Sequence, residues 1–219
     1  MRLSGSRLAI YSFLVLTLIA CVSSPLDTSD QRYLYDGGVV EVFEDHGDCY
    51  LTIDGRITKL LEPIMNQALS NLNRRECVEK IVIVSSHGGD LDVAMHIGRE
   101  LRSAKVTTDI HQYCDSACAF IYAGGTRRLA HFKSNIAPNS KLGIHQPASE
   151  LLLGKCIALD GQDPATITKI KNYLFTMLPK GAANYFFEAM INQSCKNMDY
   201  VGSKIMLDTG IATDGVNSH

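Results

Sequence analysis

The serine best suited to act as a nucleophile lies in a short segment between two cysteines. Ser116 occupies the middle of Cys114-Asp115-Ser116-Ala117-Cys118, after a run typical of a strand and before an apolar run typical of a helix. Backbone N–H groups at a helix N-terminus can stabilise negative charge that develops on a reacting group. Capping the helix is the commonest reason for a serine there, so the segment alone leaves both roles open.

A histidine and a pair of glycines could supply the other groups that acyl transfer needs. His145 ends a short apolar run, which Pro147 prevents from continuing. An imidazole at this place can take the proton of an attacking serine. Gly88 and Gly89 let the backbone approach a ligand with free N–H groups, as an oxyanion hole requires. A core or surface histidine and a plain tight turn are the structural alternatives.

Alternating strand and helix patterns position these groups. Short runs that predict strands cover residues 50–57, 80–85, 107–112 and 141–145. Apolar residues at helical spacing follow in residues 60–72, 91–103, 116–122, 164–193 and just before Gly210. Repeated strand-to-helix units predict an α/β fold with a mainly parallel sheet, in which functional groups gather at the C-terminal ends of the strands.

In this order and spacing, the segments resemble the ClpP/crotonase superfamily, and within it extracytoplasmic Clp-protease-like (SppA/ClpP-like) proteins. Residues 85–89 (SSHGG) resemble the family's NSPGG turn, with His87 in place of the proline. Residues 144–147 have the family's IHQP sequence, and residues 207–214 (LDTGIATD) are similar to its EYGLID-like ending. The resemblance covers about residues 51–216 and implies a ClpP/crotonase-like fold.

The resemblance also implies the role of each site residue. Ser116 would be the nucleophile and His145 the general base of a serine hydrolase. The N–H groups of Gly89 and Ala117 would form the oxyanion hole.

A third group must orient the imidazole, and in the family it is an Asp shortly before the terminal helix. A gapless count back from the ending reaches Met198, so Asp199 fits only after a shift of one residue. An exposed or helix-capping aspartate is the alternative reading of Asp199. Asn197 is a second candidate because an amide can also orient a histidine.

The N-terminus predicts export and lipid attachment. Arg2 and Arg7 precede an apolar run that is too short for a permanent membrane anchor, which is typical of a signal peptide. The sequence LIAC, ending at Cys21, resembles the lipobox of bacterial lipoproteins, and a chance cysteine is the alternative. We expect a signal peptide over 1–20, a lipid-anchored tether over 21–35 and one folded domain over 36–219.

Composition narrows the environment and the ligands. The net charge of −2 and the lack of a long basic run argue against nucleic acid as a partner. No CxxC pair or His-Cys cluster suggests a metal, and we expect no cofactor. Because Val22 is not the Asp that resembles an inner-membrane retention signal, we expect a periplasmic protein anchored to the outer membrane.

Six of the seven cysteines remain once Cys21 is assigned to lipid, and an even number fits an oxidising compartment. Cys114 should precede the first turn of its helix, which would let it reach Cys118. The expected disulfides are Cys114–Cys118, Cys49–Cys77 and Cys156–Cys195. Six reduced and buried thiols are the alternative.

Together these features predict an ATP-independent, peptidase-like serine hydrolase of the bacterial cell envelope. Its substrate would be a peptide or protein, and a lipid tether favours a small homo-oligomer over a closed ring of many subunits. A catalytically inactive binding module for an envelope peptide or protein is the main alternative. Acyl-CoA chemistry fits a Ser-His pair poorly, and the CxxxC spacing of Cys114 and Cys118 differs from that of thiol oxidoreductases.

The lipobox predicts a diacylated Cys21 that carries the mature chain into a detergent phase. Cys21→Ser should instead leave the chain in the aqueous phase or unprocessed. Phase partitioning and the mass of the N-terminal peptide measure this. Identical fractionation of the two proteins, with no lipid mass on the wild type, would contradict the prediction.

Overall fold

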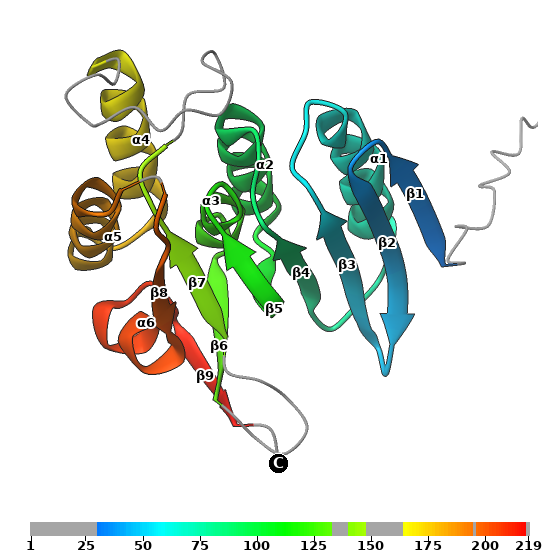
Figure 1. Ribbon diagram of the computed structural model, residues 1–219. Helices are drawn as coiled ribbons and strands as arrows, with labels where there is room; N and C mark the ends of the chain where they lie inside the picture. Colours follow the sequence, from blue (N-terminus) through cyan, green and yellow to red (C-terminus); the bar gives the residue numbers. More distant parts are fainter. Residues whose placement is uncertain (1–29, 133–139, 148–163, 195, 218–219) are drawn as a thin grey trace, which may run out of the picture.

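A mixed sheet organises the chain. The computed structural model describes residues 30–132, 140–147, 164–194 and 196–217. The strands are β1 (Gln31–Tyr35), β2 (Gly38–Asp45), β3 (Asp48–Gly55), β4 (Lys80–Ser86), β5 (Thr107–Asp115), β6 (Arg127–Phe132), β7 (Lys141–Ile144), β8 (Asp199–Gly202) and β9 (Asp214–Asn217). They are arranged in the order β1-β2-β3-β4-β5-β6-β9, with β7 beside β5 and β8 beside β7 (Figure 1).

The helices separate the parallel strands. They are α1 (Leu61–Arg74), α2 (Leu91–Ala104), α3 (Cys118–Ala123), α4 (Pro164–Met177), α5 (Lys180–Asn192) and α6 (Ser203–Thr209). Strands β3, β4, β5 and β6 pair in parallel, and β7 also pairs in parallel with β5. The expected α/β class with a mainly parallel sheet is therefore confirmed.

The N-terminal edge begins earlier than the sequence predicted. Strand β1 pairs antiparallel with β2, and Tyr33 and Tyr35 pack against the core. The Tyr35 hydroxyl also donates a hydrogen bond to the Arg56 carbonyl at 2.9 Å. The expected tether over 21–35 therefore overlaps the fold, because alternate residues of the segment 31–35 pack against the hydrophobic core. The expected signal peptide and Cys21 lie outside the described residues.

Close packing fixes α3, the helix that follows Ser116. Gly98 of α2 has no room for a side chain, because a Cβ there would lie 2.8 Å from the Phe120 carbonyl oxygen. Gly124, at the end of α3, is equally tight, since its Cβ would lie 2.4 Å from the Gly98 carbonyl oxygen. The Tyr173 hydroxyl of α4 donates to the Phe120 carbonyl at 2.6 Å. Helix α3 is thus fixed from two sides.

Two of the three expected disulfides are confirmed. Cys49 and Cys77 are bonded with their Cα atoms 5.7 Å apart, and Cys114 and Cys118 with theirs 5.1 Å apart. The third expected pair, Cys156–Cys195, lies outside the described residues. No helix within the described ranges is long and apolar enough to span a bilayer.

A histidine–carboxylate pair links β5 and β6. His131 Nε2 lies 2.8 Å from both carboxylate oxygens of Asp109, and both side chains are largely buried. The hydrogen bond to Asp109 raises the pKa of His131 above its ordinary value, and the carboxylate charge adds to this against the opposing effect of burial. The pair's contribution to stability is therefore complete below pH 6.5 and is lost as the pH rises through the raised pKa of His131.

His131→Asn should therefore destabilise the protein more at about pH 5.5 than at about pH 8.5. Urea unfolding at both pH values measures the difference in free energy of unfolding between wild type and variant. His111→Asn, a change at an exposed histidine of β5, is the matched control. A loss in His131→Asn that is the same at both pH values would contradict the assignment.

Candidate functional site

Ser116 lies at a sharp turn between β5 and α3. Its φ of +57° falls in the left-handed region, which residues other than glycine rarely adopt. The Ser116 N–H donates to the Gly143 carbonyl at 2.8 Å, which ties the turn to β7. The other residues of the segment 114–118 are buried, whereas Ser116 is only half-buried. The turn therefore presents the serine, and not its neighbours, toward solvent.

The disulfide Cys114–Cys118 closes around this turn. Cys114 is within β5 and Cys118 is the first residue of α3, so the bond joins the strand directly to the helix. Both cysteines have no exposed surface. The cross-link therefore restricts the backbone that carries Ser116.

The glycine turn after β4 lies against Ser116. A Cβ on Gly88 would be 2.8 Å from the Ser116 Cβ and 3.1 Å from the Ala117 nitrogen, so a side chain there has no space. Gly88 and Gly89 also have φ values of +95° and +143°. Only glycine adopts this backbone readily at such close range.

The N–H groups of Gly89 and Ala117 are available to a ligand. Gly89 forms a parallel bridge with Ile57, in which Ile57 donates to the Gly88 carbonyl and Asp90 donates to the Ile57 carbonyl. The Gly89 N–H is not used in this bridge. Within the described ranges, no backbone carbonyl accepts from the N–H of Gly89 or of Ala117. Unused backbone N–H groups are what an oxyanion hole requires, and the role stays a prediction.

His145 follows β7 and lies near the serine turn. Asp115 of β5 pairs with Gly143 of β7, and the Ser116 N–H donates to the Gly143 carbonyl. His145 follows Gly143 by two residues along the chain. In the described part of the chain, no hydrogen bond joins the His145 ring to the Ser116 hydroxyl. The structure thus brings the two segments together without closing the expected dyad.

Burial favours the neutral form of this imidazole. It lowers the pKa of His145 below the ordinary 6.5, against the smaller opposing effects of the Gln146 backbone and of the Asp115 charge. A neutral imidazole is the form that can accept a proton from a serine.

The register of β8 directs Asp199 away from His145. Asp199 pairs with Ile144, so both side chains lie on one face of the sheet, and Ile144 is buried in the core. His145, the next residue, faces the other side. Asp199 instead lies near Tyr185, whose pKa is raised by burial and then by the Asp199 charge. The register therefore does not support the expected orienting role of Asp199, because a shift of one residue reverses the face.

The neighbours of Asp199 do not supply the orienting group either. Met198 lies on the side of His145, and its sulfur is 2.8 Å from the place where a Cβ on Gly143 would be. A thioether is a weak hydrogen-bond acceptor. Asn197 is exposed, so it is not placed against the half-buried His145 ring.

Sequence reasoning missed a histidine–carboxylate pair beside the serine. His87 Nδ1 lies 2.8 Å from Asp115 Oδ2, and the His87 ring stacks on Tyr113 with centroids 3.9 Å apart. Asp115 is only 5% exposed, whereas His87 is 74% exposed. The replacement of the family proline by His87 was the available signal, but its partner could not be identified without the β4–β5 pairing.

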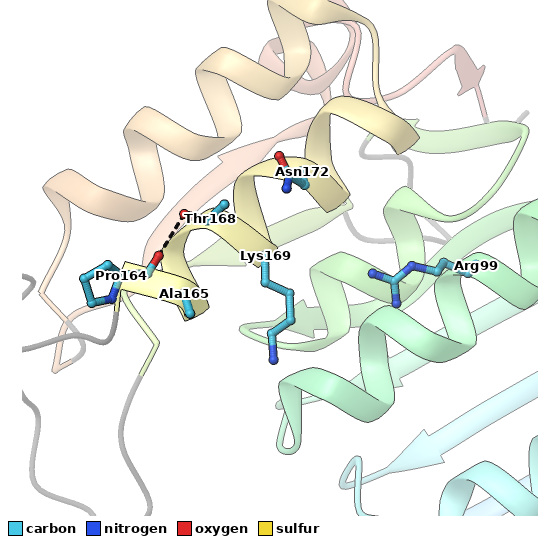
Figure 2. Close-up of a pocket in the computed structure, with 6 residues that line it drawn as sticks. All are labelled: Arg99, Pro164, Ala165, Thr168, Lys169 and Asn172. Atoms are coloured by element: carbon cyan, nitrogen blue, oxygen red, sulfur yellow. Dashed lines mark hydrogen bonds between the residues drawn. The ribbon is translucent and has the colours of Figure 1, made fainter.

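A surface hollow lies elsewhere. It measures about 550 Å³ and is formed by α2 and α4, with Arg99 and Lys169 projecting into it (Figure 2). Lys169 is paired with Asp92 at 2.5 Å, and Arg99 lies over the Tyr173 ring. A smaller hollow of about 400 Å³ is lined in part by Ile57 and Asp90, beside the glycine turn. Neither hollow is lined by Ser116 or His145.

Metal ligation has no visible basis in the described ranges. No group of three or more His, Cys, Asp or Glu side chains is arranged there to hold an ion.

Comparisons with known proteins support the fold. No family model matches the chain, and no curated protein matches its sequence. ClpP1 from Listeria monocytogenes is 18% identical with a TM-score of 0.57, over 78% of this chain and 92% of its own. A membrane-bound stomatin-specific protease in complex with a substrate peptide is 17% identical with a TM-score of 0.57, over 75% of this chain and 73% of its own.

An enoyl-CoA hydratase from Mycobacterium marinum is also similar. It is 14% identical with a TM-score of 0.53, over 81% of this chain and 76% of its own. The chain therefore has the ClpP/crotonase fold. At such identities the likeness concerns the fold and not the activity.

Removal of the Cys114–Cys118 bond should strongly affect the reactivity of Ser116 and only modestly lower the free energy of unfolding. Cys114→Ser/Cys118→Ser should slow the reaction of Ser116 with a fluorophosphonate probe by at least about tenfold, because small displacements at a reacting centre are costly. Closure of so short a loop contributes only about 2 kcal/mol to the free energy of unfolding.

The matched control is Cys49→Ser/Cys77→Ser, which opens a loop with a sequence separation of 28. It should lower the free energy of unfolding more, by about 3 to 4 kcal/mol, yet leave the labelling rate of the folded protein unchanged. Equal labelling rates in the two double variants would contradict a local role for Cys114–Cys118.

Proposed function

We propose that this chain is an ATP-independent serine hydrolase of the peptidase type that acts in the bacterial cell envelope. One observation carries the proposal: Ser116 is half-exposed at a left-handed turn and lies close to a glycine turn that has an unused N–H group. A helix cap alone requires neither the positive φ nor the close approach of Gly88. Both are expected where a serine oxygen must attack a bound carbonyl.

The reaction would proceed through an acyl-enzyme. His145 takes the proton of the Ser116 hydroxyl as its oxygen attacks the acyl carbon, and the N–H groups of Gly89 and Ala117 bind the oxyanion. His145 then gives that proton to the leaving group. Water then attacks the acyl carbon and gives a proton to His145, which returns it to the Ser116 oxygen as the acyl group leaves. The ring must move closer to the hydroxyl for the first step, as is usual when a substrate completes the site.

The N-terminal sequence supports the proposed location. A signal peptide over 1–20 and lipid at Cys21 would hold the domain at the periplasmic face of the outer membrane. Two disulfides among the described residues fit an oxidising compartment. A peptide or protein substrate is favoured because one similar solved structure, the stomatin-specific protease, holds a substrate peptide. No nucleic acid and no cofactor enter this proposal.

A binding module without turnover is the second candidate. It is favoured by the lack of a Ser116–His145 hydrogen bond in the described residues and by Met198 on the side of the imidazole. The surface around Ser116 would then hold an envelope peptide or protein without cleaving it.

Ser116→Ala and His145→Ala should each reduce fluorophosphonate labelling by roughly a thousandfold or more, and the double variant should lose little beyond either one. Because burial lowers the pKa of His145, the labelling rate of the wild type should rise with pH through a midpoint below 6.5. In-gel fluorescence across a pH series measures both effects.

Ser70→Ala is the control, since Ser70 is exposed on α1 and lies outside the site. Undiminished labelling of Ser116→Ala would contradict the hydrolase. A folded wild type that never labels, yet retains a peptide ligand, would favour the binding module.

A further inference from the structure

We propose that Asp115 is the carboxylate that orients His145, and that it acts as a positioning residue for the serine chemistry. The inference rests on the proposed function, which it extends by naming the third group of the site. Asp115 is the last residue of β5 and directly precedes Ser116. The Asp115 side chain is only 5% exposed, so its surroundings hold it in place.

The pairing of β5 with β7 places Asp115 on the correct face. Asp115 pairs with Gly143, and paired residues of neighbouring strands share a face. His145 lies two residues beyond Gly143 and one residue past the end of β7, and an extended backbone at this point places it on the same face. Two residues along a strand span about 6.6 Å, a distance that a carboxylate and an imidazole can bridge together.

Gly143 leaves the path between the two groups open. A Cβ on Gly143 would be only 2.4 Å from Asp115 Oδ1, so this oxygen lies over the glycine itself. Any larger residue would push the carboxylate away from β7.

The polar atoms that would meet are both without partners. Asp115 Oδ1 and His145 Nδ1 are buried, and neither has a hydrogen bond among the described residues. They are complementary, because the Nδ1–H of an imidazole donates and a carboxylate oxygen accepts. The charge of Asp115 also acts on His145, where it opposes the lowering of the pKa by burial.

His87 explains why only one oxygen of Asp115 is free. Its Nδ1 lies 2.8 Å from Asp115 Oδ2, and its ring is stacked on Tyr113. The carboxylate is thus fixed by one oxygen while the other is directed over Gly143. His87, which replaces the proline of the family's turn, thus holds Asp115 in place. Asp115 would in turn take the orienting role that was expected near Met198.

Asp115→Asn tests the assignment through His145 itself. Nitrogen NMR of the labelled His145 ring should show a lower pKa in Asp115→Asn than in wild type, because the stabilising charge is lost. Fluorophosphonate labelling should fall by roughly a thousandfold or more, as expected when an imidazole loses its orienting carboxylate. Asp199→Asn, the matched control, should leave both the His145 titration and the labelling rate unchanged.

His87→Ala provides a second variant at an exposed position, should Asp115→Asn fail to fold. Release of Oδ2 lets the carboxylate turn, so His87→Ala should also change the titration of His145 and slow labelling by about tenfold. An unchanged His145 titration in the folded Asp115 or His87 variant would overturn the proposal, as would a shift caused by Asp199→Asn. A titration that responds to Asp115 in a protein that never labels would support the pair and reject only the hydrolase.

Discussion

The arrangement of the site depends on one strained residue, Ser116. A left-handed conformation costs a residue other than glycine about 1–3 kcal/mol, and it persists only where the surroundings enforce it. Here a hydrogen bond to Gly143 ties the turn to β7, and the Cys114–Cys118 bond ties β5 to α3. Gly88 lies so close to Ser116 that a Cβ on Gly88 would be 2.8 Å from the Ser116 Cβ. Loss of any of these contacts would let the backbone relax toward an ordinary helix start.

The elements on either side of the Ser116 turn are themselves held in place by neighbouring contacts. Strand β4 ends in the glycine turn, which is fixed by the bridge between Gly89 and Ile57. Helix α3 cannot shift, because its carbonyl at Phe120 accepts from Tyr173 and Gly98 allows no space beside it. The serine and the two N–H groups of the proposed oxyanion hole therefore belong to elements with little freedom to move. Such prior organisation is what electrostatic stabilisation of an oxyanion needs.

Local sequence patterns predicted strands close to β3, β4, β5 and β7 and both described disulfides, but they missed β6, which pairs in parallel with β5. They also placed Ser116, His145 and the glycine pair at strand ends. The β1 strand was missed since its residues resemble a polar tether. The orientation of Asp199 depends on the register of β8 against β7, where a shift of one residue reverses the face. The position of Asp115 relative to His145 likewise follows from a long-range strand pairing that no local pattern contains.

A crystal structure of the protein after reaction with a fluorophosphonate would test the central claim most directly. The account predicts phosphorus bonded to the Ser116 oxygen, with a phosphoryl oxygen about 2.7–3.1 Å from the nitrogens of Gly89 and Ala117. The His145 ring should then contact the bonded oxygen. Phosphorus on another residue, or a phosphoryl oxygen directed away from both nitrogens, would contradict it.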